Sequence, residues 1–94
     1  MYLFTVIADY KGGSYVSQFF AKSAKGALKL WVEQFDFHYF SDNAAKIEKK
    51  LKEDIILLEK EVVPLNGLYN VWYVQFTIKK KICSLHFVRT EIEP

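Results

Sequence analysis

A stripe of apolar side chains between Ala24 and Phe35 constrains the fold of this chain more than any other feature. The stripe follows the 3.6-residue period of an α-helix, and charged side chains at Lys25, Lys29 and Glu33 occupy the opposite face. A helix with one apolar face must bury that face against another element. The stripe consists of Ala24, Ala27, Leu28, Trp31, Val32 and Phe35, and Ser23 precedes it as a favourable N-cap residue.

The residues before this helix predict a β-hairpin. Residues 2–10 and 14–21 are rich in β-branched and aromatic side chains, and Gly12-Gly13 lies between them. A Gly-Gly pair is a strong hairpin signal because primed turns need positive φ angles. A two-residue loop at these glycines pairs Tyr10 with Tyr15 and Val6 with Phe19.

The residues after position 68 predict a second hairpin, with strands at about 69–78 and 81–90. Apolar side chains alternate along both segments, and matching their faces pairs Trp72 with Phe87 and Thr77 with Ile82. The residues from Ile78 to Lys81 contain neither Gly nor Asn. We therefore expect a four-residue loop built on a type I turn, not a two-residue primed turn.

The middle of the chain predicts a connector, a short helix and another strand. Residues 36–42 read as a connector, and residues 43–53 as a solvated helix with a narrow apolar stripe. Residues 54–63 favour a strand because most of their apolar side chains prefer extended structure. The charged residues 59–61 interrupt this strand and suggest either an edge strand or a bulged one.

Together these elements predict one α+β domain built as a two-layer sandwich in the order ββααβββ. A mostly antiparallel sheet of about five strands packs on one amphipathic helix, with a shorter solvated helix beside it. The 94 residues suit one domain, and a hydrophobic content of 51% excludes a disordered chain. The expected core consists of Phe4, Val6, Phe19, Leu28, Trp31, Val32, Phe35, Trp72, Val74, Phe76, Leu85 and Phe87.

The second face of the predicted sheet is also rich in apolar residues, which is unusual for a solvated face. Burying it in a symmetric dimer would explain this pattern, since one patch then meets itself. The alternative is that the second helix folds over the same face. We expect a non-enzymatic protein-interaction module that homodimerises or binds an unidentified protein partner through Leu3, Ile7, Val16, Phe20, Val71, Tyr73, Ile82 and Val88.

A run of aromatic residues at Phe35, Phe37, Tyr39 and Phe40 extends beyond the helix stripe. Connectors usually carry polar residues. We expect these rings to close one end of the sheet; the other interpretation is a pocket or partner surface.

Few side chains suggest chemistry. His38 with Asp36 and Asp42 could hold a metal, and Ser84 lies two residues from His86, but neither group has the further partners that a metal or catalytic site needs. We therefore expect no catalytic, cofactor-binding or metal site.

The single cysteine, Cys83, falls in the expected core and cannot form an internal disulfide. We expect an inert thiol and a reducing, cytoplasmic location. No apolar run approaches the roughly 18 residues of a membrane span, so we expect no membrane association.

The alternative function is nucleic-acid binding at the second hairpin tip. Lys79, Lys80 and Lys81 could grip phosphates, and Tyr69 and Tyr73 could stack on bases. A net charge of +2 is too weak to imply a polyanionic partner, and lysines at a turn also serve to keep it solvated.

The first third of the chain resembles HicB-type antitoxins. A strand, Gly12-Gly13, a second strand and a helix that opens with Ser23-Ala24 and continues with Ala27-Leu28 also occur in that family. The similarity covers about residues 1–35. The Pro-Gly segment typical of the family is missing after the second strand and the second half differs, so no function is carried over.

Overall fold

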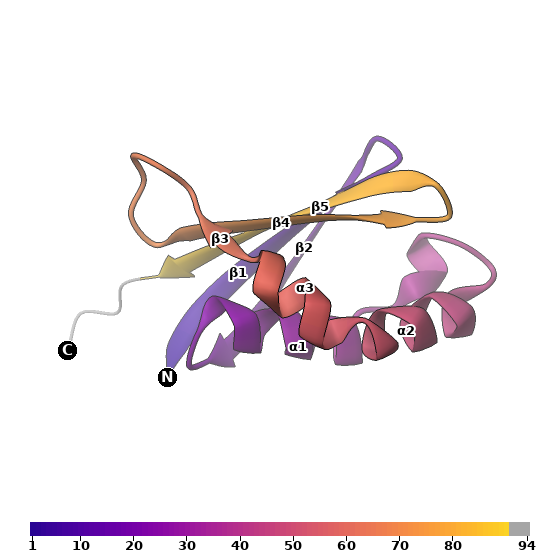
Figure 1. Ribbon diagram of the computed structural model, residues 1–94, viewed down its shortest axis with the longest axis horizontal. Coiled ribbons are helices and arrows are strands. Elements are labelled where there is room, and N and C mark those ends of the chain that lie inside the picture. The colour runs from indigo at the N-terminus through magenta and orange to yellow at the C-terminus, as the bar shows by residue number, and fades with distance from the viewer. Residues whose placement is uncertain (91–94) are drawn as a thin grey trace.

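The computed structural model describes residues 1–90, which form a five-stranded antiparallel sheet with its helices on one face (Figure 1). The predicted α+β class and two-layer arrangement are confirmed, with one more helix than expected. In chain order the elements are β1 (Tyr2–Tyr10), β2 (Gly13–Ala21), α1 (Ala24–Gln34), the 3-10 helix η1 (Phe37–Tyr39), α2 (Ala44–Glu53), α3 (Ile55–Glu61), β3 (Val63–Pro64), β4 (Val71–Ile78) and β5 (Lys81–Thr90).

The strand order is β2-β1-β5-β4-β3, so the first and last long strands meet at the centre of the sheet. Their pairing runs from Leu3 opposite Thr90 to Tyr10 opposite Cys83. This contact joins the two hairpins into one sheet. Strands at the centre have neighbours on both sides, and β1 and β5 accordingly carry many of the fully buried side chains.

The first hairpin turns one residue earlier than predicted. Lys11 and Gly12 both have positive φ, at 49° and 80°, and Tyr10 pairs with Gly13. Every predicted pair therefore shifts by two residues, and Ala8 pairs with Tyr15. A shift of two leaves each side chain on its predicted face.

Gly13 has a different role from the one predicted. A Cβ atom at Gly13 would lie 2.8 Å from the Tyr15 hydroxyl oxygen. The missing side chain therefore makes room for the Tyr15 ring, while Gly12 supplies the positive φ of the turn.

The second hairpin has the predicted register but a different turn. Trp72 pairs with Phe87 and Thr77 with Ile82, as expected, while Ile78 pairs directly with Lys81. The expected four-residue loop is thus wrong. Lys79 and Lys80 form a two-residue turn with φ angles of 50° and 66°, a conformation that Gly, Asn and Asp adopt at lower cost than lysine.

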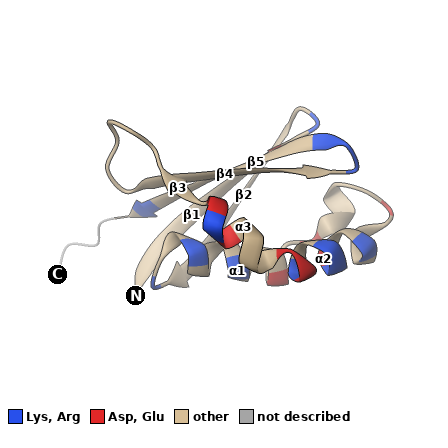
Figure 2. Ribbon diagram, viewed as in Figure 1, with Lys and Arg blue, Asp and Glu red and all other residues tan. Residues whose placement is uncertain are grey.

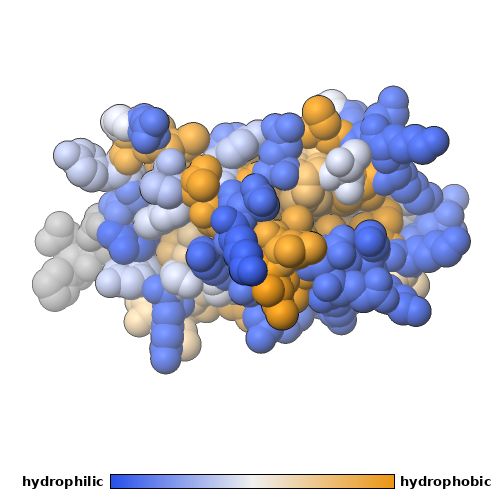
Figure 3. All heavy atoms as spheres, in the orientation of Figure 1, coloured by the Kyte–Doolittle hydropathy of each residue, from blue (hydrophilic) through white to orange (hydrophobic). Residues whose placement is uncertain are grey.

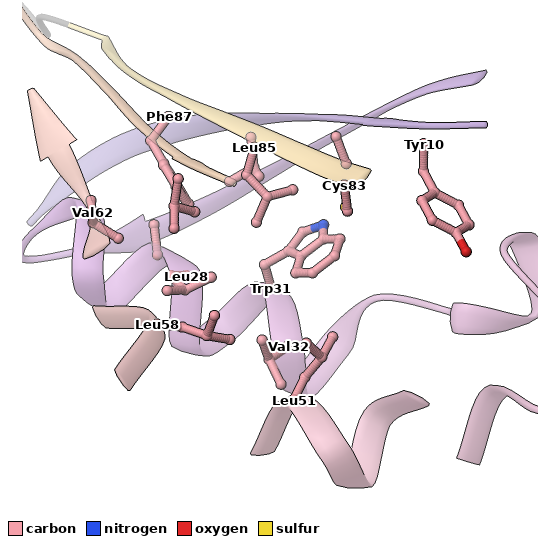
Figure 4. Close-up of a cluster of buried hydrophobic side chains, with 14 of the residues drawn as sticks. Tyr10, Leu28, Trp31, Val32, Leu51, Leu58, Val62, Cys83, Leu85 and Phe87 are labelled. Atoms are coloured by element: carbon pink, nitrogen blue, oxygen red, sulfur yellow. The ribbon is translucent and has the colours of Figure 1, made fainter. Parts of the chain in front are cut away.

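The stripe of α1 packs against the sheet as predicted. The Ser23 side chain accepts a hydrogen bond from the Gly26 backbone at 3.1 Å and caps the helix. Figure 4 shows Trp31 and Leu28 pointing from α1 towards Leu85 and Phe87 of the sheet. All of the predicted core residues are buried except Phe19, Phe35, Trp72 and Phe76, which are partly buried.

The predicted strand at residues 54–63 is wrong over most of its length. Residues Ile55–Glu61 form α3, and only Val63–Pro64 add an edge strand to the sheet. A short apolar run cannot by itself distinguish strand from helix, and the charged residues that follow are good helix formers. Leu58 and Val62 are buried, whereas Ile56 and Leu57 are 68% and 63% exposed.

The aromatic run closes one end of the core, as the sequence predicts. Phe37 and Phe40 are buried, and the Phe40 ring lies 4.4 Å from that of Tyr10 between centroids. Phe35 stacks on Trp31 at 4.8 Å. Tyr39 is the exception, since it is 67% exposed.

The strained turn of the second hairpin predicts a stabilising substitution. Replacing Lys79-Lys80 with Asn-Gly should raise the free energy of unfolding by about 1–2 kcal/mol, because Asn and Gly adopt positive φ at lower cost. Denaturant unfolding of the double variant measures this gain. Lys81→Gly, in the extended start of β5, is the control and should destabilise the protein. If the turn variant is no more stable than the wild type, the positive φ angles at Lys79 and Lys80 do not cost stability.

Cys83 predicts a pH-dependent loss of stability. Burial, with a smaller contribution from Asp9, raises the pKa of Cys83 to about 12. An unfolded thiol ionises near about pH 8.5, so above that pH only the unfolded state loses this proton. Between these pKa values the thiol should lower the free energy of unfolding by up to about 1.4 kcal/mol per pH unit.

Cys83→Ala supplies the comparison for this thiol. The variant should be less stable than the wild type near neutral pH, because it leaves a cavity. The difference should shrink above about pH 9, since the variant has no thiol to ionise. Unfolding curves at several pH values measure this difference. If it stays constant with pH, the pKa of Cys83 is not raised in the folded state.

Candidate interaction surface: the open face of the sheet

One face of the sheet carries no helix. Among residues 1–90, all three α-helices lie on the opposite face, where α2 packs against α1 and η1 (Figure 1). The alternative in which the second helix covers this face is therefore wrong. We call the uncovered side the open face; its side chains come from alternate residues of β1, β2, β4 and β5.

The registers align the open-face side chains in rows across the sheet. One row is largely apolar and runs through Val16, Ile7, His86, Tyr73 and Val63. The next row towards the N-terminus of β1 consists of Gln18, Thr5, Val88 and Val71, and beyond it Phe20 lies opposite Leu3. Cross-strand neighbours in such rows are in side-chain contact. The apolar residues of these rows therefore form a connected surface. Ile82 lies apart from it, opposite Thr77, beyond a row of Ser14, Asp9, Ser84 and Gln75.

The predicted interface residues divide by exposure into two groups. Val16, Phe20 and Ile82 are 65%, 60% and 60% exposed. The others are half-buried by their neighbours in the sheet: Leu3, Ile7, Val71, Tyr73 and Val88. The first group protrudes from the surface that the second group forms.

The polar side chains of the open face largely satisfy one another. Gln18 Nε2 donates to Thr5 Oγ1 at 3.1 Å, and the Ser14 hydroxyl donates to the Asp9 carboxylate. The Tyr73 hydroxyl donates to the Gln75 side-chain oxygen, and the Tyr73 ring lies 4.9 Å from that of His86. Because these polar groups bond to one another, the surface that the open face offers to a partner is mainly apolar.

The outer edge of β2 adjoins this face, a feature that the sequence analysis did not identify. A pair that closes a two-residue turn, here Tyr10 and Gly13, is hydrogen-bonded in both directions. Alternation then directs the backbone N–H and C=O groups of Ser14, Val16, Gln18 and Phe20 away from β1. The same residues carry their side chains on the open face, so edge and face form one continuous surface.

The group around His38 has a structural explanation. The Asp36 carboxylate accepts hydrogen bonds from the His38 backbone at 3.0 Å and from His38 Nδ1 at 2.8 Å. These bonds, led by the backbone bond, lower the pKa of Asp36, which caps η1. Asp36, His38 and Asp42 line a shallow cleft of about 390 Å³. Within residues 1–90, no group of three or more His, Cys, Asp and Glu side chains is arranged to hold a metal.

The proposed nucleic-acid residues lie in separate places. Lys79, Lys80 and Lys81 are exposed at the tip of the β4–β5 hairpin, where Lys79 Nζ donates to Ser41 Oγ at 2.6 Å. Tyr73 lies six residues before Lys79 along β4, or about 20 Å at the rise of a strand. Tyr69, at 93% exposure, precedes the opposite end of that strand. A nucleic-acid site at the tip stays a prediction, and the structure does not bring its lysines and tyrosines together.

Comparisons with known proteins leave the function open. No model of a protein family, no curated protein and no solved structure matches this chain. In the part of the chain that the structure describes, no helix is long and apolar enough to cross a membrane. What the protein does must therefore be inferred from its own surfaces.

Proposed function

We propose that this protein is a non-enzymatic interaction module that forms a homodimer through the open face of its sheet. The observation that carries the proposal is the exposure of Val16, Phe20 and Ile82 on a face that no described helix covers. Soluble monomers rarely expose a contiguous apolar patch beyond a few hundred Å² unless it serves an interaction.

The charge distribution supports a second copy as the partner. Asp9 is the only charged residue whose position in β1, β2, β4 or β5 places it on the open face. Figure 2 shows charged residues mainly on the helices and the hairpin turns. Interface cores are depleted of charge and enriched in aromatic residues, and Phe20 and Tyr73 supply the rings here. Two such faces can meet without charge repulsion.

The symmetry of a dimer suits a single self-complementary face. In a two-fold arrangement the same patch meets itself, so Phe20 of each protomer is buried by the same operation. The proposed contact is therefore open face against open face. Pairing of two β2 edges would instead place both open faces on one side of a larger sheet and leave them uncovered.

Lysine substitutions on the open face test this proposal. Phe20→Lys and Ile82→Lys each place a charge on the proposed interface and should weaken association at least about thirtyfold, or roughly 2 kcal/mol. Light scattering after size-exclusion chromatography should give twice the 11.0 kDa chain mass for the wild type and one chain mass for the variants at matched concentration.

Ile56→Lys and Leu57→Lys are the matched controls, because both residues are as exposed as Phe20 but lie on α3 across the sheet. They should remain dimeric. Circular dichroism verifies that every variant folds. A monomeric wild type, or folded Phe20→Lys and Ile82→Lys variants that stay dimeric, would exclude the open face as the interface.

A further inference from the structure

A cleft of about 480 Å³ lies on the helical side, between α2 and the end of β4. Its floor is apolar and consists of Ile47 and Leu51 from α2 and Ile78 from β4. These side chains are 6%, 4% and 4% exposed to solvent. The volume is within the range of roughly 300–1,000 Å³ that is typical of small-molecule sites. Of the residues that line this cleft, only Thr77 belongs to the open face.

The short β3 strand explains why the cleft exists. β3 pairs only with Trp72 and Tyr73, so within residues 1–90 the second half of β4 has no neighbour on its outer edge. α2 packs against α1 and η1 and stands beside this edge without closing on it. The Tyr10 hydroxyl donates to the Ile78 carbonyl at 2.9 Å and fixes the end of β4.

The rim of the cleft has one sign of charge. Lys46 and Lys50 lie one helical turn apart on α2, and Lys79 lies on the opposite wall, while no acidic residue lines the cleft. Lys50 Nζ also lies 3.4 Å from Asp54 outside the lining. Figure 2 shows lysines both on α2 and at the tip of the β4–β5 hairpin, and Figure 3 shows apolar surface between these two basic groups.

We propose that this cleft binds a small amphiphilic carboxylate, meaning one flexible apolar chain that ends in a carboxylate. The chain would lie on Ile47, Leu51 and Ile78, where its own methylene groups leave water. The carboxylate would accept charge-assisted hydrogen bonds from Lys46 and Lys50 on one wall and from Lys79 on the other, where Lys79 Nζ would exchange its Ser41 Oγ acceptor for the carboxylate. An uncharged chain would contact only the apolar floor, and a small anion would contact only the lysines.

Titration with decanoate, kept below its critical micelle concentration, tests the proposal. Amide NMR spectra should show saturable shifts confined to α2 and the β4–β5 hairpin. Decanol, with the same chain but no charge, and acetate, with the charge but no chain, should each bind at least about tenfold more weakly. Octanoate should bind more weakly than decanoate by about fourfold per missing methylene.

Charge reversal identifies the site. Lys46→Glu and Lys50→Glu should each weaken decanoate binding at least about tenfold. Lys49→Glu, on the same helix but outside the cleft lining, should bind as the wild type does. Amide spectra without ligand confirm that each variant is folded. Absent or non-saturable shifts, equal binding of decanol, or an equal loss in Lys49→Glu would overturn the proposal.

Discussion

The packing of the α1 stripe against the centre of the sheet is the contact on which the rest of this structure depends. Trp31 and Leu28 are fully buried, and they meet side chains of β5 such as Leu85 and Phe87 that are equally buried (Figure 4). The pairing of β1 with β5 joins the two hairpins, and the α1 stripe covers the strands at which they join. A domain of this size has little further core with which to replace it.

The same packing leaves the protein with two kinds of accessible apolar surface. The helical layer covers one face of the sheet, so the other face contacts either solvent or a partner. The sheet also leaves the second half of β4 without an outer neighbour beside α2, because β3 contributes only Val63 and Pro64. The open face is nearly uncharged and suits a second copy, whereas the cleft is ringed by lysines and suits an anion. The open face thus follows from the single helical layer, and the cleft from the short β3 strand.

Local patterns in the sequence predicted the faces of the elements well and the connections less well. Alternation around Val74 and Leu85 fixed the second register, because a slip by one residue would have exposed Cys83 and Phe87. The predicted register of the first hairpin is wrong by two residues at Gly12-Gly13, but the same side chains are buried with either turn. Helix α3 was missed because Ile55 and Leu58 have spacing that a buried strand or a helix can accommodate.

The features of the candidate surfaces needed the tertiary structure. The apolar residues of the open face were predicted from the registers, but their lack of cover depends on where α2 packs, and no local pattern specifies that. The strand order also depends on contacts between residues far apart in the chain, such as Val6 and Phe87. The cleft joins Lys46 and Lys79 from opposite walls, a proximity that composition alone does not reveal.

Sedimentation equilibrium of the untagged wild-type protein tests the central claim most directly. The account predicts a reversible monomer–dimer equilibrium whose larger species has twice the 11.0 kDa chain mass. Its dissociation should depend weakly on salt, since the proposed interface contains almost no charge. A single species of one chain mass at every concentration would contradict the account, because the open face would then remain exposed to water in the native protein.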